Sequence, residues 1–335
     1  MKVAGFTFIN NAKANFSLSI KKNKIAYYAL NLLRQIIPTI IYRTALQRKL
    51  SLINKYSQTE ILSRVDYYNK LSTFKHLGEK AVALKDMPIF KSPKVYNFDT
   101  FEYTRYFNGK LKANFVFGDV TEIENVPSLQ KSRPIYGDNS NAVLLKLDKK
   151  RHFVFLKDRI PYSKKKDMLI GRGVISQPHR IRFMEMYFKN PWCDLGQVNK
   201  QGGNLKWLKP KISIQAHLQY KFILSLEGND VATNMKWIMS SNSIAVMPTP
   251  KFETWFMEGV LIPDYHYMCI KNDFSDLEQK LQYYITHPEK AEEIVHNAQL
   301  YVKQFWDKKK EDLISLLVLQ KYFYCTEQIT ELYES

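Results

Sequence analysis

The stretch from Lys221 to Pro248 constrains the fold more than any other part of the chain. It contains two short apolar runs, Phe222–Leu226 and Ile244–Met247, each with the length and composition of a buried strand. Between them, a turn at Gly228 leads into Met235–Met239, whose apolar residues recur at helical spacing. A strand–helix–strand unit of this size almost always forms a right-handed parallel crossover. We therefore expect an α/β fold with a parallel sheet.

The same unit predicts a ligand site. In parallel sheets, ligands bind beyond the carboxyl ends of the strands, where a glycine turn meets a helix N-terminus whose amides attract phosphate. Asp230 or Thr233 can cap the helix that follows the turn. The alternative is that the glycine only makes a turn and that the polar residues near it only cap the helix. The candidate binding residues are Gly228, Asn229, Asp230 and Asn234.

Composition indicates a globular protein with a strong positive charge. The 335 residues suffice for two domains, and 45% of them are hydrophobic. The 50 Lys and Arg outnumber 32 Asp and Glu, and the formal net charge of +18 attracts polyanions such as nucleic acid, anionic lipid or phosphorylated substrates. The three cysteines lack metal spacing, and no stretch has the length and apolarity of a transmembrane helix. We expect no metal site and a reducing, cytoplasmic compartment.

The chain divides into four parts. We expect a helical N-terminal extension over residues 1–60, a first domain over 61–165, a second over 166–305, and a C-terminal helix over 306–335 that packs back on the first domain. The boundary between the domains is expected in a polar, charged stretch headed by Pro161.

The extension carries two apolar stretches, Ala26–Leu33 and Ile36–Tyr42, flanked by lysines and arginines. A basic amphipathic segment of this kind can lie on an anionic membrane surface. The alternative is a helical hairpin that packs on the first domain and keeps its lysines in solvent.

The remaining segments are assigned by their periodicity. We expect a helix over residues 59–85, a strand and the start of a helix over 94–107, a strand over 152–156, a polar loop over 194–207 and a helix over 251–259.

A carboxylate follows the apolar run that begins at Phe115. Asp119 lies beside Gly118 at the end of this predicted strand, where parallel-sheet enzymes place catalytic groups. The alternative is an aspartate that only begins the loop toward Pro127.

A second glycine turn, at residues 171–173, is predicted after the apolar run that ends at Ile170, and Pro178 opens a helix soon after it. Arg172 and Arg180 would then flank a turn and a helix N-terminus, an arrangement that suits a diphosphate. The alternative is two surface arginines.

Two acidic residues lie on the helix predicted over 251–259. Glu253 or Glu258 could bind a ribose hydroxyl pair, as acidic residues do in nucleotide folds. Either could instead pair with Lys251 on the same helix.

Taken together, these segments resemble glycosyltransferase family 90. Leu224–Trp237, Phe252–Gly259 and Pro263–Tyr267 are similar to the family's signature segments. The bacterial lipopolysaccharide-core branch, which is related to animal protein O-glucosyltransferases, is similar in further segments. The resemblance extends from about residue 95 to 305 and leaves residues 1 to about 60 uncovered. The segments shared with the bacterial branch are Phe117–Thr121, Lys131–Ile135 and Gly137–Lys146.

The resemblance implies a GT-B fold, in which two Rossmann-like domains face each other across a cleft and the second domain holds the nucleotide sugar. It implies an inverting, metal-independent transfer of a hexosyl or pentosyl group from a UDP-sugar, without a cofactor. The acceptor it implies is a lipid-linked or lipopolysaccharide-core saccharide, built by a peripheral protein at the cytoplasmic face of the inner membrane.

The family's functional positions carry over to residues named above. Asp119 matches the general base, which takes the proton of the acceptor hydroxyl. Arg172, Gly173 and Arg180 match the diphosphate site, where positive charge aids departure of the leaving group. Animal members place acids on both sides of this second arginine, whereas this chain has His179 and Ile181.

A further departure lies after Gly228. Animal members have an arginine where this chain has Asn234, so Lys236 and Asn229 become candidates for contacting the phosphates.

Two other classes of protein fit parts of the sequence. A basic protein that binds nucleic acid or membrane without catalysis would explain the charge, but the aromatic residues do not form a strand-borne stacking platform interleaved with Lys and Arg. We therefore expect no nucleic-acid partner. A family member that has become a binding scaffold would explain Asn234, whereas Asp119 and Arg180 favour an active enzyme.

Overall fold

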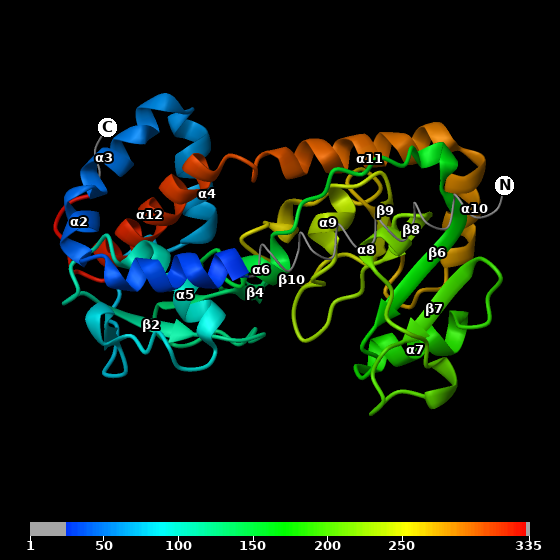
Figure 1. Ribbon diagram of the computed structural model, residues 1–335, viewed down its shortest axis with the longest axis horizontal. Helices are drawn as coiled ribbons and strands as arrows, with labels where there is room; N and C mark the ends of the chain where they lie inside the picture. The colour runs from blue at the N-terminus through cyan, green and yellow to red at the C-terminus, as the bar shows by residue number, and fades with distance from the viewer. Residues whose placement is uncertain (1–24, 333–335) are drawn as a thin grey trace.

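The structure, a computed structural model, describes residues 25–332. The chain forms two lobes that lie side by side, each built around a sheet of mainly parallel strands (Figure 1). The long helix α11 (Pro288–Lys303) lies along the second lobe, and α12 (Lys308–Cys325) returns to the first. The expected α/β architecture with parallel sheets is confirmed.

The first lobe contains a four-stranded sheet in the order β1-β2-β3-β5. Strands β2, β3 and β5 are parallel, and the two-residue edge strand β1 is antiparallel to β2. The strands are β1 (Val82–Ala83), β2 (Lys112–Val116), β3 (Ser128–Gln130) and β5 (Ala142–Leu144). Besides a helix over residues 25–36, the helical segments are α2 (Thr39–Thr44), α3 (Leu46–Leu50), η1 (Ser51–Lys55), α4 (Gln58–Tyr68), η2 (Leu84–Asp86), α5 (Lys94–Thr104) and α6 (Lys149–His152).

The second lobe contains a five-stranded, fully parallel sheet in the order β11-β9-β8-β6-β7. The strands are β6 (Lys166–Gly173), β7 (Cys193–Gln197), β8 (Tyr220–Leu224), β9 (Ile244–Met247) and β11 (Met268–Cys269). The helical segments besides α11 are η3 (Tyr162–Lys164), α7 (Pro178–Tyr187), η4 (Leu205–Trp207), α8 (Ile214–His217), α9 (Met235–Met239), η5 (Glu258–Val260) and α10 (Leu277–Thr286). The predicted strand–helix–strand unit is confirmed as β8, α9 and β9.

The second sheet is buried on both faces, and successive residues of its strands enter different cores. On β8, Phe222 packs in a core with α7 and α10, whereas Ile223 packs in a core with α9. On β9, Ile244 packs in the same core as Phe222, and Ala245 packs in the same core as Ile223. A strand that is buried on both faces has a continuous run of apolar residues in its sequence. This is why these strands could be predicted from the sequence.

Two features join the lobes. Strand β10 (Phe252–Thr254) lies in sequence between β9 and β11 of the second lobe but pairs antiparallel with β4 (Ser132–Pro134) of the first. Helix α12 contacts α4 and α5, and its Glu311 carboxylate lies 2.7 Å from Arg64 Nη1 and 2.8 Å from Lys146 Nζ. The first lobe is therefore completed by segments from the last third of the chain.

Several predicted elements are wrong. Helix α4 ends at Tyr68, so the helix predicted over 59–85 is too long. Residues 94–104 form the single helix α5, where we expected a strand first, and residues 153–156 do not form a strand. The predicted loop over 194–207 contains most of β7, and the helix predicted over 251–259 is β10 followed by a turn. Pairing with distant strands overrides the local periodicity at these segments.

Candidate active site

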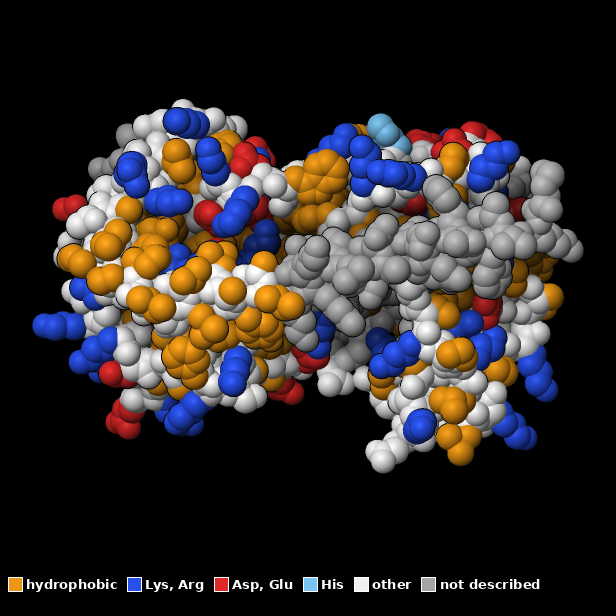
Figure 2. Space-filling model, viewed as in Figure 1, with side chains coloured by type: hydrophobic (Ala, Val, Ile, Leu, Met, Phe, Trp, Pro, Cys, Tyr) orange, Lys and Arg blue, Asp and Glu red, His pale blue; other side chains and the backbone are white. Residues whose placement is uncertain are grey.

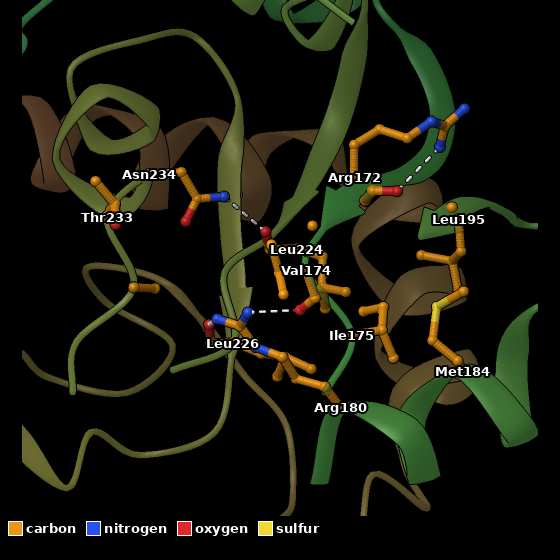
Figure 3. Close-up of a pocket in the computed structure, with 14 residues that line it drawn as sticks. Arg172, Val174, Ile175, Arg180, Met184, Leu195, Leu224, Leu226, Thr233 and Asn234 are labelled. Carbon is orange, nitrogen blue, oxygen red and sulfur yellow. Dashed lines mark hydrogen bonds between the residues drawn. The ribbon is translucent and has the colours of Figure 1, made fainter. Parts of the chain in front are cut away.

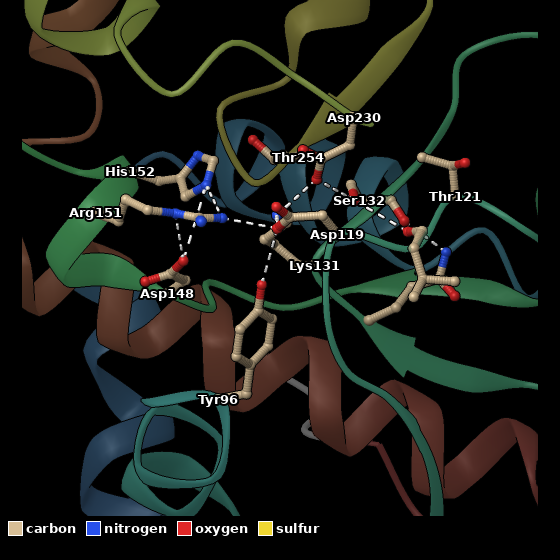
Figure 4. A network of polar contacts seen from close by, with 12 residues as sticks. Tyr96, Asp119, Thr121, Lys131, Ser132, Asp148, Arg151, His152, Asp230 and Thr254 are labelled. Carbon is tan, nitrogen blue, oxygen red and sulfur yellow. Dashed lines mark hydrogen bonds and ion pairs between the residues drawn. The ribbon is translucent and has the colours of Figure 1, made fainter. Parts of the chain in front are cut away.

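Asp119 lies just beyond the carboxyl end of β2, as the sequence predicts. Its side chain is 35% exposed, and its Oδ1 accepts hydrogen bonds from Lys131, from Arg151 Nη2 at 2.7 Å and from Tyr96 Oη at 3.3 Å. Figure 4 shows these side chains converging on the carboxylate. Its Oδ2 makes no hydrogen bond to any residue that the structure describes. This oxygen can therefore accept a hydrogen bond from a water molecule or from a hydroxyl group of a substrate.

The two cations keep the Asp119 carboxyl ionised. Partial burial acts to raise its pKa, but the hydrogen bonds and charges of Lys131 and Arg151 outweigh burial and hold the pKa below the ordinary value. Asp148 pairs with Arg151 at 2.8 Å, and burial raises the pKa of that second carboxyl. His152 is 1% exposed, and burial followed by the charge of Lys236 lowers its pKa, which makes it a neutral ring at physiological pH.

The Asp119 site is joined to the second lobe through two side chains. Lys131, which is 1% exposed, also contacts Asp230 Oδ2 at 2.6 Å. Ser132 Oγ donates to the same oxygen at 2.8 Å and lies 3.2 Å from the carbonyl oxygen of Val120. Asp230 belongs to the turn after β8. The contacts thus bring the candidate base and the glycine turn to one place between the lobes.

Two neighbouring pockets lie at the carboxyl ends of the strands of the second sheet. The larger, of about 360 Å³, is bounded by the turn after β8, the start of α7 and the segment after β9. The smaller, of about 290 Å³, lies between β6 and β8 (Figure 3). Both include Leu226 and Ala232 in their walls. Pockets of this size, at this edge of a parallel sheet, suit a small polar ligand.

Arg180 holds the turn between the two pockets. Its guanidinium donates to the carbonyl oxygens of Glu227, Val174 and Leu226 at 2.7–2.8 Å, and Figure 3 shows it between these loops. Burial lowers its pKa from the ordinary value. A Cβ at Gly228 would meet Arg180 Nη2 at 3.4 Å, an ordinary van der Waals contact, and Gly228 does not have a positive φ, so the turn does not require glycine at this position. Asn229, at the rim, accepts a hydrogen bond from Gln177.

Other predicted diphosphate residues have different surroundings. Gly173 is the last residue of β6, so residues 171–173 form the end of a strand where we expected a turn. Arg172 contributes to the smaller pocket, but its guanidinium pairs with Asp194 at 2.7 Å. The Asn234 side chain donates a hydrogen bond to the carbonyl oxygen of Leu224 at 2.9 Å and accepts one from the hydroxyl of Ser225. Neither Asp230 nor Thr233 caps α9, which has no side-chain cap.

Three predicted site residues are engaged inside the protein. Lys236 is fully buried and paired with Glu258, so its ammonium is not free for phosphate. Glu258 borders the larger pocket, yet its carboxylate also accepts a hydrogen bond from the backbone N–H of Thr254. Glu253 lies 2.8 Å from Arg133 Nε, accepts from the Tyr67 hydroxyl, and is 1% exposed. Glu253 therefore stabilises the β4–β10 junction, and the structure gives it no access to a ribose.

Four polar residues were missed as site residues. Lys131 and Arg151 both hold the Asp119 carboxylate. Glu227 faces the larger pocket and accepts backbone hydrogen bonds from Lys251 and Phe252, while burial raises its pKa. His179 Nε2 donates to the Glu227 carbonyl oxygen at 2.8 Å. The position of Glu227 directly after β8 was an available signal, because the carboxyl end of a parallel strand favours functional residues.

Within residues 25–332, no group of three or more His, Cys, Asp or Glu side chains is arranged to hold a metal ion, and none of the helices in that range is long and apolar enough to cross a membrane.

The family model described as glycosyl transferase family 90 matches residues 147–323, which is more than half of the chain. The chain belongs to glycosyltransferase family 90. It is 45% identical over 263 residues to O-glucosyltransferase LpsA of Dichelobacter nodosus, an alignment that covers 78% of this chain and 82% of that protein. It is 25% identical over 161 residues to human protein O-glucosyltransferase 3, covering 45% of this chain and 31% of the human protein.

Membership of the family confirms the resemblance drawn from the sequence. The family model begins at residue 147 and therefore does not include Asp119, Lys131 or Ser132. The alignment with LpsA covers most of the chain. A glycosyltransferase of this family uses a sugar donor and an acceptor.

Proposed function

We propose that the protein is an inverting, metal-independent glycosyltransferase that moves a hexosyl or pentosyl group from a UDP-sugar to a hydroxyl of a lipopolysaccharide-core or other surface-glycan acceptor. The observation that carries this proposal is the ionised Asp119 carboxylate, which has one free oxygen and is connected through Lys131 to the glycine turn beside the pockets. The similarity to the O-glucosyltransferase LpsA makes glucose the first donor sugar to test.

Asp119 would act as the general base. In an inverting transfer, the acceptor oxygen attacks the anomeric carbon from the face opposite the leaving group and loses its proton as the new bond forms. Asp119 Oδ2 would receive that proton, while Oδ1 stays held by Lys131 and Arg151. The bond from the anomeric carbon to the diphosphate oxygen breaks, and UDP leaves with the electron pair. Hydrogen bonds that fix Oδ1 orient the free oxygen without blocking it.

The donor would occupy the two pockets of the second lobe. The turn at Gly228 and the start of α7 offer backbone amides to the diphosphate, and Arg180 provides a positive charge beside them. Arg172 would act through its charge near the smaller pocket, because its guanidinium is occupied by Asp194. Glu227 replaces Glu253 as the acidic residue best placed for a ribose, since it borders the pocket and is partly exposed.

The arrangement of the two lobes supports a GT-B organisation. Each lobe has a mainly parallel sheet (Figure 1), and Asp230 of the second lobe contacts Lys131 of the first. In this proposal the first lobe binds the acceptor and provides the base, and the second lobe binds the donor. No cofactor takes part.

Replacing Asp119 by asparagine tests the assignment. We expect Asp119→Asn to lower turnover by about a hundredfold or more, because general-base catalysis typically contributes that much. Lys131 keeps Asp230 and Arg151 keeps Asp148 as partners, so the fold and the donor pockets should be retained. Stabilisation by UDP-glucose in a thermal unfolding assay should therefore equal that of the wild type, with and without EDTA.

The outcomes separate the rival explanations. Unchanged turnover of Asp119→Asn would refute Asp119 as the base. Loss of donor stabilisation in EDTA would refute metal independence. Stabilisation of the wild type by oligonucleotides and by no nucleotide sugar would favour a nucleic-acid-binding protein.

A further inference from the structure

The helix over residues 25–36 packs on the first lobe through its polar side. Tyr27 Oη donates to Asp99 of α5 at 2.8 Å, and Arg34 Nη2 lies 2.7 Å from Glu102 on the same helix. Asn31 lies between them in sequence and is 1% exposed. These three residues are spaced four and three apart, so they share one face of the helix. Most surface helices bury their apolar side, whereas this helix buries its polar side against the first lobe.

The apolar side of this helix faces outward and continues into α2. Eight Leu and Ile side chains, seven on the two helices and Ile37 in the bend between them, are between 39% and 77% exposed. Figure 2 shows hydrophobic side chains gathered over this part of the first lobe. We call this set the apolar face. It consists of Ile25, Leu30, Leu32, Leu33, Ile36, Ile37, Ile40 and Ile41.

The apolar face continues toward the loop before α5. Phe90 is 56% exposed, and its ring meets Phe98 edge-on, while Phe98 in turn meets Tyr28. Lys91 and Lys94, next to Phe90 in sequence, are both exposed. Contiguous exposed apolar surface of this kind marks a site of interaction with a membrane or another protein.

Charge distinguishes between these occupants. The first 59 residues contain no Asp or Glu and ten cationic residues, which are Lys2, Lys13, Lys21, Lys22, Lys24, Arg34, Arg43, Arg48, Lys49 and Lys55. This segment therefore carries +10 of the chain's net charge of +18. A second copy docked on the same face would bring two such segments together, and like charges repel. An anionic bilayer attracts them, and it accepts apolar side chains below its headgroups.

We propose that the apolar face is a membrane-docking surface that inserts into the headgroup region of an anionic bilayer, to which the positive charge of the first 59 residues attracts it. The polar contacts of Tyr27 and Arg34 with α5 fix the helix to the first lobe, so docking would hold the whole lobe at the bilayer. This inference rests on the exposed face and on charge, and it does not depend on the transferase activity.

Vesicle sedimentation of the full chain tests the proposal. We expect binding to vesicles of phosphatidylglycerol and phosphatidylethanolamine, weaker binding at high salt, and little binding to phosphatidylcholine alone. The double substitution Ile36→Ser and Ile40→Ser should weaken binding by about tenfold or more, because both side chains would leave the apolar region. The matched control, Leu205→Ser with Ile262→Ser, changes two exposed apolar residues of the second lobe and should bind as the wild type does.

The controls make each result decisive. Ile36 and Ile40 are exposed and outside the pockets, so thermal stability and stabilisation by UDP should not change in the double variant. Equal vesicle binding by wild type and variant would overturn the proposal, and so would equal weakening in the control. Analytical ultracentrifugation without lipid would overturn it as well if it shows a dimer that the double variant dissociates, because the occupant would then be a second copy.

Discussion

At the scale of single residues, the chemistry depends on how Asp119 is held. Lys131 and Arg151 come from different segments of the first lobe and meet on one oxygen of the carboxylate. Lys131 also contacts Asp230, so one ammonium group serves both the candidate base and the turn of the donor lobe. Lys131 therefore lowers the pKa of Asp119 and, through its contact with Asp230, holds the turn of the second lobe beside the candidate base.

Replacing Lys131 by methionine should therefore alter the pH dependence of activity. Burial alone raises the pKa of Asp119, and Lys131 is the main influence that lowers it. Without Lys131 that pKa rises, so a larger fraction of Asp119 is protonated and inactive at mildly acidic pH. We expect the acidic limb of kcat/KM to move to higher pH. Lys290→Met, which removes a lysine from an exposed pair with Glu293, is the control and should leave the limb in place.

An acidic limb that does not move in Lys131→Met would contradict this account of Asp119. The thermal stability of the variant should be measured in parallel, because Asp230 keeps only Ser132 as a partner after the substitution.

At the scale of elements, buried ion pairs join segments that are distant in sequence. Glu311 of α12 is 2% exposed and pairs with Arg64 of α4 and with Lys146, and it also accepts the indole N–H of Trp255 at 2.7 Å. One carboxylate thus connects α12, α4, the chain after β5 and the chain after β10. Burial acts to raise the pKa of Glu311, but Lys146 and Arg64 outweigh it and lower the pKa.

Replacing Glu311 by alanine should destabilise the protein strongly. It would leave Arg64 and Lys146 buried without their counter-ion, and losing one partner of a buried pair typically costs about 3–5 kcal/mol. The free energy of unfolding in urea measures this loss. Lys321→Ala breaks a partly exposed pair of the same helix with Asp66 and a hydrogen bond to the Asn69 carbonyl oxygen, and it should cost less, about 1–2 kcal/mol. Similar losses in the two variants would show that the Glu311 cluster has no special structural role.

At the scale of the whole molecule, the C-terminal helix completes the first lobe. Twelve residues of α12 are buried, and eight of them are large apolar side chains. Each such side chain contributes about 1.5–3 kcal/mol when it is buried. The sum is comparable to or larger than the typical net stability of a folded protein, about 5–15 kcal/mol.

A chain that ends at Phe305 should therefore fail to form the first lobe. We expect a loss of cooperative thermal unfolding and rapid proteolysis within residues 60–150, because the core beneath α12 would be open to water. The control is a chain that ends at Glu331 and retains α12 entirely, and it should unfold as the full chain does. Cooperative unfolding of the shorter chain near the wild-type temperature would contradict the prediction.

The sequence alone determined the elements whose signals are local. Strands β8 and β9 are buried on both faces, so their apolar runs are continuous and easily recognised. Asp119 was placed at the end of a strand because the apolar run before it stops at a glycine. The family was recognised because several separate segments match in order, and the comparisons confirm it.

Only the tertiary structure decided which polar residues are free to act. Glu253 and Arg133 are 120 residues apart, and nothing near either one in sequence indicates that they form a buried pair. Lys236 and Glu258 are removed from the candidate site in the same way, whereas Lys131 and Arg151 are added to it. The physical reason is that periodicity reports one residue's neighbours along the chain, while the availability of a charge depends on burial and on partners that folding brings from elsewhere.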